Sequence, residues 1–330
     1  MSSTREKIKR FLKQLKTNAK VLVIINADPD AISSAMAVKR LLWRNVSEVA
    51  IAHFNRISRP DNLTLIELTD AGLVDLASLD KTYFDHFIIV DSQPDHNAAF
   101  AGVTYDAIID HHPVSAPEAV YTDIRPDYGA CATILTEYLK SWNIKPSGKL
   151  AAALMMGIKT DTASFTRQAT LKDIRAFQYL YKFADNNIVT KVERAFFTNE
   201  DLDFLGVAIK KRREVNNRVF YHAGTISKPD ELVVVADFFL SIAGVNWSII
   251  SGVMDRKLII ILRNDGLRKG AGNTAKEAFS KYGSAGGHKT MARAELSLHL
   301  IRKDTGTAAQ KFLADWIIDR IEKTAGKKIE

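Results

Sequence analysis

Short apolar runs alternate with helical segments along the first half of this chain, and this alternation restricts the fold more than any other feature. Four runs are strand-like, beginning with "VLVIIN": 21–26, 49–54, 86–91 and 105–110. A continuous β-branched run is typical of a parallel strand that is buried on both faces. Three segments have helical patterns: 31–43, 130–142 and 147–162. Strands that alternate with helices predict an α/β fold with a doubly wound parallel sheet.

The pattern changes past about residue 185, which suggests a second domain in a chain of 330 residues. We interpret 1–186 as the first domain and the charged, helical segment 187–218 as a connector. The remainder, 219–330, is predicted to be a smaller α/β domain. In it we expect strands at 232–239, 247–255 and 257–263 and a final helix at 307–324.

The amino-acid composition limits the kinds of metal site and of binding partner that this chain can have. The only cysteine is Cys131, which excludes a disulfide framework within one chain and a Cys-rich zinc site. A net charge of +8 favours polyanionic partners such as nucleotides, polyphosphate or nucleic acid, although scattered charges fit ordinary solubility equally well. No apolar stretch is long enough to span a membrane and no secretory signal is evident, so we expect a cytoplasmic protein. The final helix fits either core packing or the seam of a homodimer.

Acidic residues follow the apolar runs of the first domain. Asp28 and Asp30 follow the first run, Asp91 closes "FIIVD", and Asp161 follows the apolar run 150–158. We expect them at the carboxyl edge of the sheet, where ligands bind in α/β folds. Clustered carboxylates ionise together only around a cation. The simplest alternative for the first pair is that Asp30 caps the following helix while Asp28 lies on a turn.

The tetrapeptide "DHHP" adds imidazoles to this set. Adjacent histidines in a strand point to opposite faces, so we expect one of His111 and His112 to be a ligand and the other to meet substrate. Asp110 is expected to orient a ring. Carboxylates and imidazoles together suit manganese, iron or zinc. The alternative is a polar turn that Pro113 ends.

In this order, the motifs "NADPDAISSA", "IIVDSQP", "IIDHHP" and "GIKTDTASF" resemble those of the DHH phosphoesterase superfamily. Its members include manganese-dependent pyrophosphatases, single-strand-specific exonucleases, and oligoribonuclease/pAp phosphatases. "ILRNDG" (261–266) and "GSAGGHKTMARA" (283–294) look like the DHH-associated C-terminal substrate domain. The resemblance thus covers nearly the whole chain.

The resemblance implies roles for individual residues. One divalent metal would be held by Asp30, Asp91, His111 and Asp161, and a second by Asp28 and Asp91. His112 would face the scissile phosphate, with Asp110 supporting the histidines. The far end of the substrate would be held by Arg263, Gly286, Gly287 and His288. Without the first-domain motifs, "SAGGH" would be interpreted as a flexible turn.

One position departs from the family pattern. Most members have a metal-ligating histidine four residues before the first Asp of the first motif, and here that residue is Ile24. Asn26 lies on the same face of an extended strand and offers an amide oxygen, which is a weaker ligand. The sequence leaves open whether a second metal binds only with substrate, whether one metal suffices, or whether catalysis is impaired.

The expected function is a manganese-dependent phosphoesterase that uses one or two ions, with magnesium or another divalent ion as an alternative. Short oligonucleotides or 3′,5′-bisphosphonucleosides such as pAp fit best as substrates. The C-terminal motifs argue against pyrophosphate, and no further nucleic-acid-binding domain is evident. Two alternatives stay open: a nucleotide-binding sensor with little or no turnover, and a short-chain exopolyphosphatase.

Overall fold

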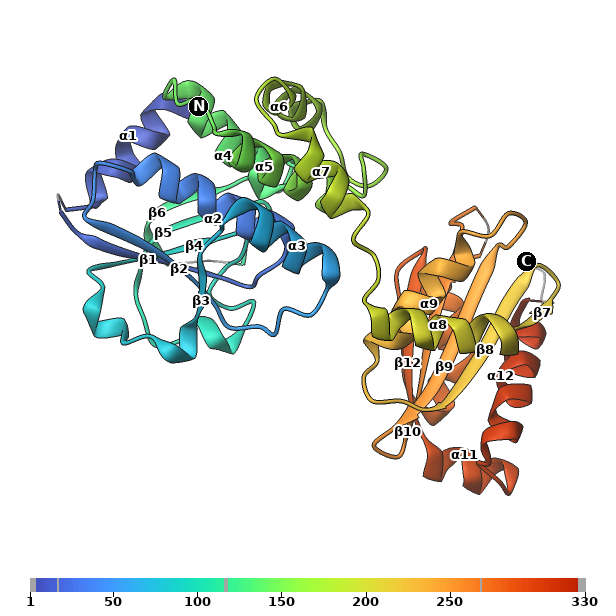
Figure 1. Cartoon of the computed structure of the whole chain (residues 1–330). Helices are drawn as coiled ribbons and strands as arrows, with labels where there is room; N and C mark the ends of the chain where they lie inside the picture. Colours follow the sequence, from blue (N-terminus) through green and yellow to red (C-terminus); the bar gives the residue numbers. More distant parts are fainter. Residues whose placement is uncertain (1–3, 17, 116–117, 268, 326–330) are drawn as a thin grey trace. The chain divides into compact units, whose positions relative to one another are not determined.

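The computed structural model describes residues 4–16, 18–115, 118–267 and 269–325. The chain divides into two compact units, residues 1–196 and 197–330 (Figure 1). Each unit has a sheet and a core of its own.

The first unit is built on a six-stranded sheet in which all neighbouring strands are parallel, in the order β3-β2-β1-β4-β5-β6. The strands are β1 (Lys20–Ile25), β2 (Glu48–His53), β3 (Leu73–Asp75), β4 (His86–Val90), β5 (Tyr105–Asp110) and β6 (Ala119–Ile124). The predicted α/β fold with a parallel sheet is therefore confirmed. The strand order reverses between β1 and β4, and such a switch point is where ligands bind in sheets of this kind.

Helices cover one face of this sheet (Figure 1). The helices of the unit are α1 (Thr4–Gln14), α2 (Pro29–Leu42), α3 (Pro60–Thr69), α4 (Cys131–Ser141), α5 (Gly148–Asp161), α6 (Leu171–Tyr181) and α7 (Asn186–Glu193). Val21, Val23 and Ile25 face the large core beneath them. The alternate residues Leu22 and Ile24 lie in an apolar cluster on the other face, together with residues of short 3-10 turns. Burial on both faces explains the continuous apolar run of β1.

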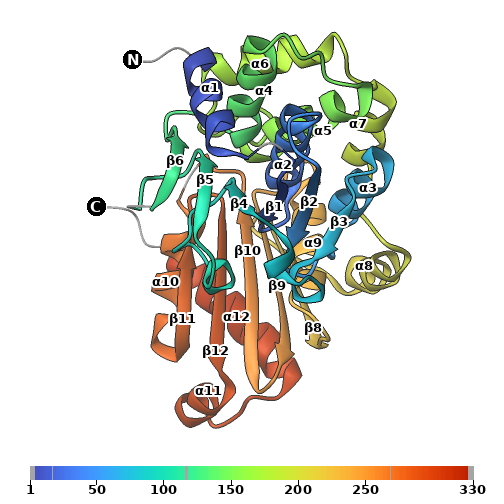
Figure 2. The same ribbon diagram turned by 90° about the vertical axis from the view of Figure 1, so that its left-hand side faces the viewer.

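The second unit has a six-stranded mixed sheet in the order β11-β12-β10-β9-β8-β7. The strands from β11 to β8 can be followed in Figure 2. Its strands are β7 (Arg213–Val215), β8 (Arg218–Thr225), β9 (Trp247–Met254), β10 (Lys257–Asn264), β11 (Gly283–Gly287) and β12 (Met291–Ser297). Its helices are α8 (Asn199–Lys211), α9 (Asp230–Leu240), α10 (Ala271–Phe279), α11 (Leu298–Thr305) and α12 (Gln310–Ala325). One core lies between the sheet and α10 and α12, and a second between the sheet and α8 and α9. The expected second α/β domain is present.

The prediction of a strand at 232–239 is wrong, because these residues belong to α9. Three consecutive valines favoured a strand by their β-branching. However, the buried residues are Leu232, Val235, Ala236 and Phe239, which is the spacing of one helix face. Besides β9 and β10, the sheet contains β7, β8, β11 and β12, none of which was among the predicted strands.

The segment predicted as a connector is not one helix. α7 packs through Ile188, Val189 and Val192 into the core of the first unit. A new helix, α8, begins after Thr198, whose side chain forms a capping box with Asp201. The division between the units, at Phe196 and Phe197, falls inside the predicted connector.

Candidate active site and metal centre

The turn from β1 into α2 places the first two acidic residues. Asp28 is extended and is the N-cap of α2, since its Oδ1 accepts a hydrogen bond from the Ala31 N–H at 2.9 Å. Pro29 occupies the first helical position, where its fixed φ is favourable. Asp28, and not Asp30, therefore caps α2. The alternative in which Asp30 caps this helix is wrong. Asp30 is free to point elsewhere.

Asp30 points at the N-terminus of another helix. Its two carboxylate oxygens accept hydrogen bonds from the N–H groups of Cys131 at 2.6 Å and Ala132 at 2.7 Å. The N-cap residue of α4 is Ala130, whose side chain makes no capping hydrogen bond. Asp30 from α2 thus supplies the capping oxygens of α4, and its carboxylate is held rigidly although it is fully buried.

Asp91 follows β4 directly and has an unusual backbone. Its φ is +59°, in the left-handed region that Asp and Asn enter more readily than most residues. Its N–H still donates to the Ile109 carbonyl at 2.9 Å, so the chain turns only after this sheet hydrogen bond is made. The result is a carboxylate at the switch point between β4 and β1.

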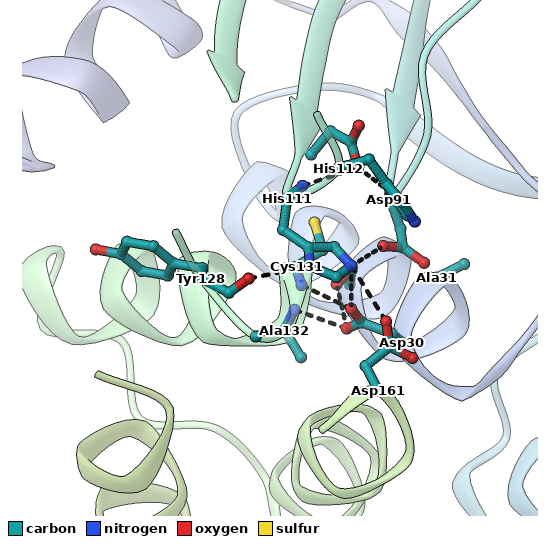
Figure 3. Close-up of polar contacts among 12 residues, drawn as sticks. Asp30, Ala31, Asp91, His111, His112, Tyr128, Cys131, Ala132 and Asp161 are labelled. Carbon is teal, nitrogen blue, oxygen red and sulfur yellow. Dashed lines mark hydrogen bonds and ion pairs between the residues drawn. The ribbon is translucent and has the colours of Figure 1, made fainter. Parts of the chain in front are cut away.

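Four predicted ligands converge, as Figure 3 shows. One atom from each of Asp30, Asp91, His111 and Asp161 lies within 4.8 Å of all the others. From His111 Nε2, the nearest carboxylate oxygen of Asp161 is 3.1 Å away, of Asp91 3.3 Å and of Asp30 3.8 Å. Asp161 is the last residue of helix α5, so it reaches the cluster from a helix and not, like Asp91, from the end of a strand. Helix α5 packs against α2, which brings Asp161 to the same place.

Two atoms of this cluster fit a bound cation. His111 Nε2 and Asp91 Oδ1 are buried and make no hydrogen bond to any described residue, although they lie 3.3 Å apart. On the other side of the ring, His111 Nδ1 donates to the Tyr128 carbonyl at 3.2 Å, which fixes the ring and directs Nε2 at the carboxylates. Buried polar atoms without partners are costly, and oxygen and imidazole donors together suit a divalent metal.

The charges of the cluster lead to the same conclusion. Burial raises the pKa of Asp30 to about 7, and the charges of Asp161 and Asp28 add to the effect. Burial, and then the charges of Asp30 and Asp28, raise the pKa of Asp91 well above its usual range. For His111, burial opposes protonation, but the nearby carboxylates of Asp161, Asp91 and Asp30 outweigh it and raise the pKa to about 12. Positive charge is therefore favoured strongly at this point, whether a proton or a metal ion supplies it.

His112 is held beside the cluster by Asp110. Its Nδ1 donates to Asp110 Oδ1 at 2.8 Å, and the same oxygen accepts the His111 N–H at 2.8 Å. Burial opposes ionisation of Asp110, yet its contacts with His112 and Gln93 keep its pKa below the ordinary value. The His112 side chain is 42% exposed, so its free Nε2 can be reached from solvent.

Sequence reasoning missed two residues that hold these loops. The fully buried Gln93 donates from Nε2 to Asp110 Oδ2 at 2.7 Å and to the Pro113 carbonyl at 3.0 Å. Asn55 pairs with the backbone of Ala27, accepting its N–H at 2.7 Å and donating to its carbonyl at 2.9 Å. The only available signal was position, since Gln93 follows a motif acid by two residues and Asn55 follows β2 by two.

The residues predicted to bind the far end of the substrate lie in the second unit. Arg263 and Gly287 are at the same end of its sheet, because they pair with Met291 and Ala292 of the strand between them. Arg263 Nε donates to Asp237 Oδ1 at 2.6 Å, and His288 is exposed. The alternative of a flexible turn at "SAGGH" is wrong, because Gly283–Gly287 forms strand β11.

Comparison with known proteins identifies the chain. Residues 20–158 match the family model described as the DHH family, N-terminal domain. A protein of Methanocaldococcus jannaschii is 32% identical over 326 residues, which cover 98% of this chain and 67% of the relative. The chain belongs to the DHH phosphoesterase superfamily.

Solved structures share the fold of this family member. An exopolyphosphatase-related protein from Bacteroides fragilis superimposes with a TM-score of 0.67 at 17% identity, over 97% of this chain and 96% of the other. RecJ from Thermus thermophilus, solved in complex with Mn²⁺, superimposes with a TM-score of 0.51 at 14% identity, over 99% of this chain and 55% of RecJ. At these identities the likeness is one of fold.

The departure from the DHH pattern at Ile24 has a structural counterpart. Ile24 is fully buried in the apolar cluster with Leu22 and Ile89, and Asn26 is exposed. Asp28 belongs to none of the acid and imidazole groups that converge within 4.8 Å among the described residues.

Over the part of the chain that the structure describes, no helix has the length and apolar character needed to cross a membrane.

Proposed function

We propose that this protein is a metal-dependent phosphoesterase that hydrolyses short oligonucleotides or 3′,5′-bisphosphonucleosides such as pAp. The observation that carries the proposal is the convergence of three carboxylates on His111 Nε2, with two buried atoms left without hydrogen bonds. A site of this composition has little use in a protein that only binds a neutral ligand. Membership of the DHH superfamily supports a phosphoester as the substrate.

In this proposal Asp30, Asp91, His111 and Asp161 hold the main metal ion, with Mn²⁺ as the leading candidate. When bound, the ion lowers the pKa of a coordinated water and neutralises charge on the phosphoryl group. The chain's own part is to keep the ligands in place: the amides of α4 hold Asp30, and the Tyr128 carbonyl holds His111. Asp28 is proposed as a ligand of a second, weaker ion, shared with Asp91.

His112 is the proposed catalytic imidazole. Because Nδ1 donates to Asp110, the accessible Nε2 is the atom that faces substrate, and in the protonated ring its N–H donates to the phosphoryl or leaving oxygen and stabilises negative charge there. Asp110 keeps the ring in this orientation and stabilises its protonated form, as buried carboxylates do for other catalytic histidines.

Arg263, Gly286, Gly287 and His288 are proposed to bind the end of the substrate remote from the scissile bond. The net charge of +8 favours substrates with several phosphates. Short-chain polyphosphate stays as an alternative substrate, and the buried Ile24 keeps open the alternative of a nucleotide sensor.

The test is release of phosphate or mononucleotide from pAp, a dinucleotide, a long oligonucleotide and polyphosphate. Each is assayed with Mn²⁺, with Mg²⁺ and with chelator. Asp91→Asn is the informative variant, because Asn tolerates the left-handed φ of +59° while removing the charge. We expect it to lower turnover by about a hundredfold or more, the usual scale for losing a group that organises charge at the reacting centre.

Asp70→Asn is the matched control. Asp70 has a φ of +53° and is exposed, so the same chemical change is made in the same backbone conformation away from the site. Its activity should equal that of the wild type. Full metal-dependent activity in Asp91→Asn would refute the proposed site, and tight nucleotide binding without turnover in the wild type would favour the sensor.

A further inference from the structure

A second histidine lies beside His112. The ring centroids of His96 and His112 are 5.5 Å apart in an edge-to-face arrangement. Nitrogen atoms of both rings lie within 4.8 Å of each other and of an Asp110 oxygen. His96 is exposed, so its outer edge is open to a ligand that reaches His112.

The position of His96 is set by a turn. The His96 N–H donates to the Gln93 carbonyl at 3.0 Å, which closes a four-residue turn with Pro94 at its second position, where proline is favoured. The turn is anchored by the Gln93 side chain, whose Oε1 accepts the Ser115 N–H at 2.9 Å and whose Nε2 donates to Asp110. Asp110 thus orients His112 directly and the His96 turn through Gln93.

Hydrogen bonding also sets the tautomer of His96. The Gln93 N–H donates to His96 Nδ1 at 3.2 Å, and Ser92 Oγ lies 3.2 Å from the same atom. A backbone N–H can only donate, so Nδ1 is unprotonated and the proton of the neutral ring is on Nε2. His112 has the opposite arrangement, with its Nδ1 proton on Asp110. Neighbouring rings therefore present a fixed donor, His96 Nε2–H, and the accessible Nε2 of His112, which donates when that ring is protonated.

We propose that His96 is a phosphate-binding residue, whose Nε2–H donates to an oxygen of the same phosphate that His112 contacts. The inference rests on the proposed function and adds a residue to its substrate site. Phosphate oxygens are strong acceptors, and two imidazoles at one site can bind two oxygens of one group. Closure of the turn does not need the imidazole, because the backbone hydrogen bond and Gln93 already provide it.

Two substitutions separate this role from a structural one. In His96→Gln, the side-chain amide reaches the position of Nε2 and still donates. In His96→Asn, the shorter side chain can accept the Gln93 N–H in place of Nδ1 but cannot reach the phosphate. We expect His96→Asn to raise KM for pAp, and the inhibition constant of inorganic phosphate, about tenfold, with a smaller effect on kcat. His96→Gln should recover most of this affinity.

The reverse ranking would overturn the proposal. If Asn behaves as the wild type while Gln is impaired, the imidazole serves only to accept the Gln93 N–H. Equal kinetics in both variants would overturn it as well. His299→Asn, at an exposed histidine on α11, is the control and should change neither constant.

Failure of the proposed function can be told apart from failure of this inference. If the wild type hydrolyses none of the substrates, binding of inorganic phosphate to the manganese-loaded protein is measured by calorimetry. Weaker binding in His96→Asn than in His96→Gln would support the role of His96. No binding by the wild type, or equal binding by all three proteins, would refute it.

Discussion

At the scale of single residues, the site depends on side chains that are held by the backbone of other segments. Asp28 and Asp30 are two residues apart, yet one caps its own helix and the other caps α4, about a hundred residues later in the chain. The two carboxylates therefore have different expected effects on metal binding. Residue 157 of α5 must be glycine for Asp30 to keep this position, because a Cβ on Gly157 would lie 3.0 Å from Asp30 Cα and 2.6 Å from Ser33 Oγ.

Asp28→Asn and Asp30→Asn should differ in metal stoichiometry. Asn is as good an N-cap as Asp, so Asp28→Asn should fold normally and keep one tightly bound Mn²⁺. Asp30→Asn should lose it, with affinity lower by about a hundredfold, because a charged ligand is gone and an amide NH₂ would face the α4 amides. Calorimetry and metal analysis give the stoichiometry. Two tight ions in the wild type and one in Asp28→Asn would instead make Asp28 a full ligand.

Gly157→Ala and Gly206→Ala should have opposite effects on stability. Both glycines are inside helices, where alanine is favoured by about 1 kcal/mol. At Gly206 nothing lies within 4 Å of the added Cβ, so that gain should appear in full. At Gly157 the clash with Asp30 and Ser33 should cost about 1–3 kcal/mol and also weaken Mn²⁺ binding. Urea unfolding with and without metal measures both effects, and a stabilised Gly157→Ala with unchanged affinity would contradict this account.

At the scale of elements, helix ends in the first unit are connected by buried carboxylates. Asp173 is fully buried and is the third residue of α6, where it forms a capping box with Thr170. It also accepts hydrogen bonds from the Gly129 N–H at 3.1 Å and from Thr133 Oγ1 at 2.6 Å, which fix the start of α4. The same N-terminus of α4 binds the Asp30 carboxylate, so Asp173 holds in place the helix end that orients this proposed metal ligand.

Asp173→Ala should therefore destabilise the protein more than Asp201→Ala. Both residues complete a Thr-x-x-Asp capping box. Among the described residues, the side-chain hydrogen bonds of Asp201 stay within its own box, whereas those of Asp173 also reach Gly129 and Thr133 at the start of α4. We expect a loss of about 1 kcal/mol for Asp201→Ala and about 3 kcal/mol for Asp173→Ala, which leaves buried donors without partners. Urea unfolding followed by circular dichroism checks the difference. Equal losses would show that the contacts to α4 contribute nothing.

At the scale of the whole molecule, the metal site couples ligand binding to folding through its carboxyl groups. Burial raises the pKa of Asp28 to about 6 and that of Asp30 to about 7. A carboxyl group with a raised folded pKa destabilises the fold increasingly as pH rises from its ordinary value of about 4 towards the raised value. His111 keeps its proton over this pH range, because its pKa is raised to about 12. Its positive charge offsets part of the repulsion among the ionised carboxylates.

Mn²⁺ should accordingly stabilise the protein more at pH 8 than at pH 5.5. At the lower pH, protons on the carboxyl groups compete with the metal, whereas at pH 8 the groups of Asp28 and Asp30 are largely ionised. At a hundred times Kd, binding adds about 2.7 kcal/mol, which corresponds to roughly 5–10 °C in Tm for a unit of this size. Thermal unfolding with Mn²⁺ and with chelator at both pH values gives the comparison. An equal increase in Tm at both pH values would exclude this coupling. So would an increase in Tm of Asp91→Asn as large as that of the wild type.

Local patterns in the sequence were sufficient for the parallel sheet, because burial on both faces requires a continuous apolar run such as that of β1. They also marked the acids after the apolar runs as candidate ligands, whereas the choice of His111 over His112, to join Asp30, Asp91 and Asp161, came from the resemblance to the DHH superfamily. They failed at α9, where β-branched residues favoured a strand and packing against the sheet of the second unit favoured a helix.

Only the tertiary structure decided how these residues meet. The Asp30 carboxylate is oriented by α4, the Asp110 carboxylate by Gln93, and the Ala27 backbone by Asn55, and each contact joins segments distant in sequence. No periodicity records such pairs, because a hydrogen bond across the fold places no constraint on neighbouring residues in the chain. The sequence by itself determined the four central strands of the first sheet, β2, β1, β4 and β5, and which ligand atoms are available. Packing of α2, α4 and α5 over one end of the sheet determined that those atoms converge on one point.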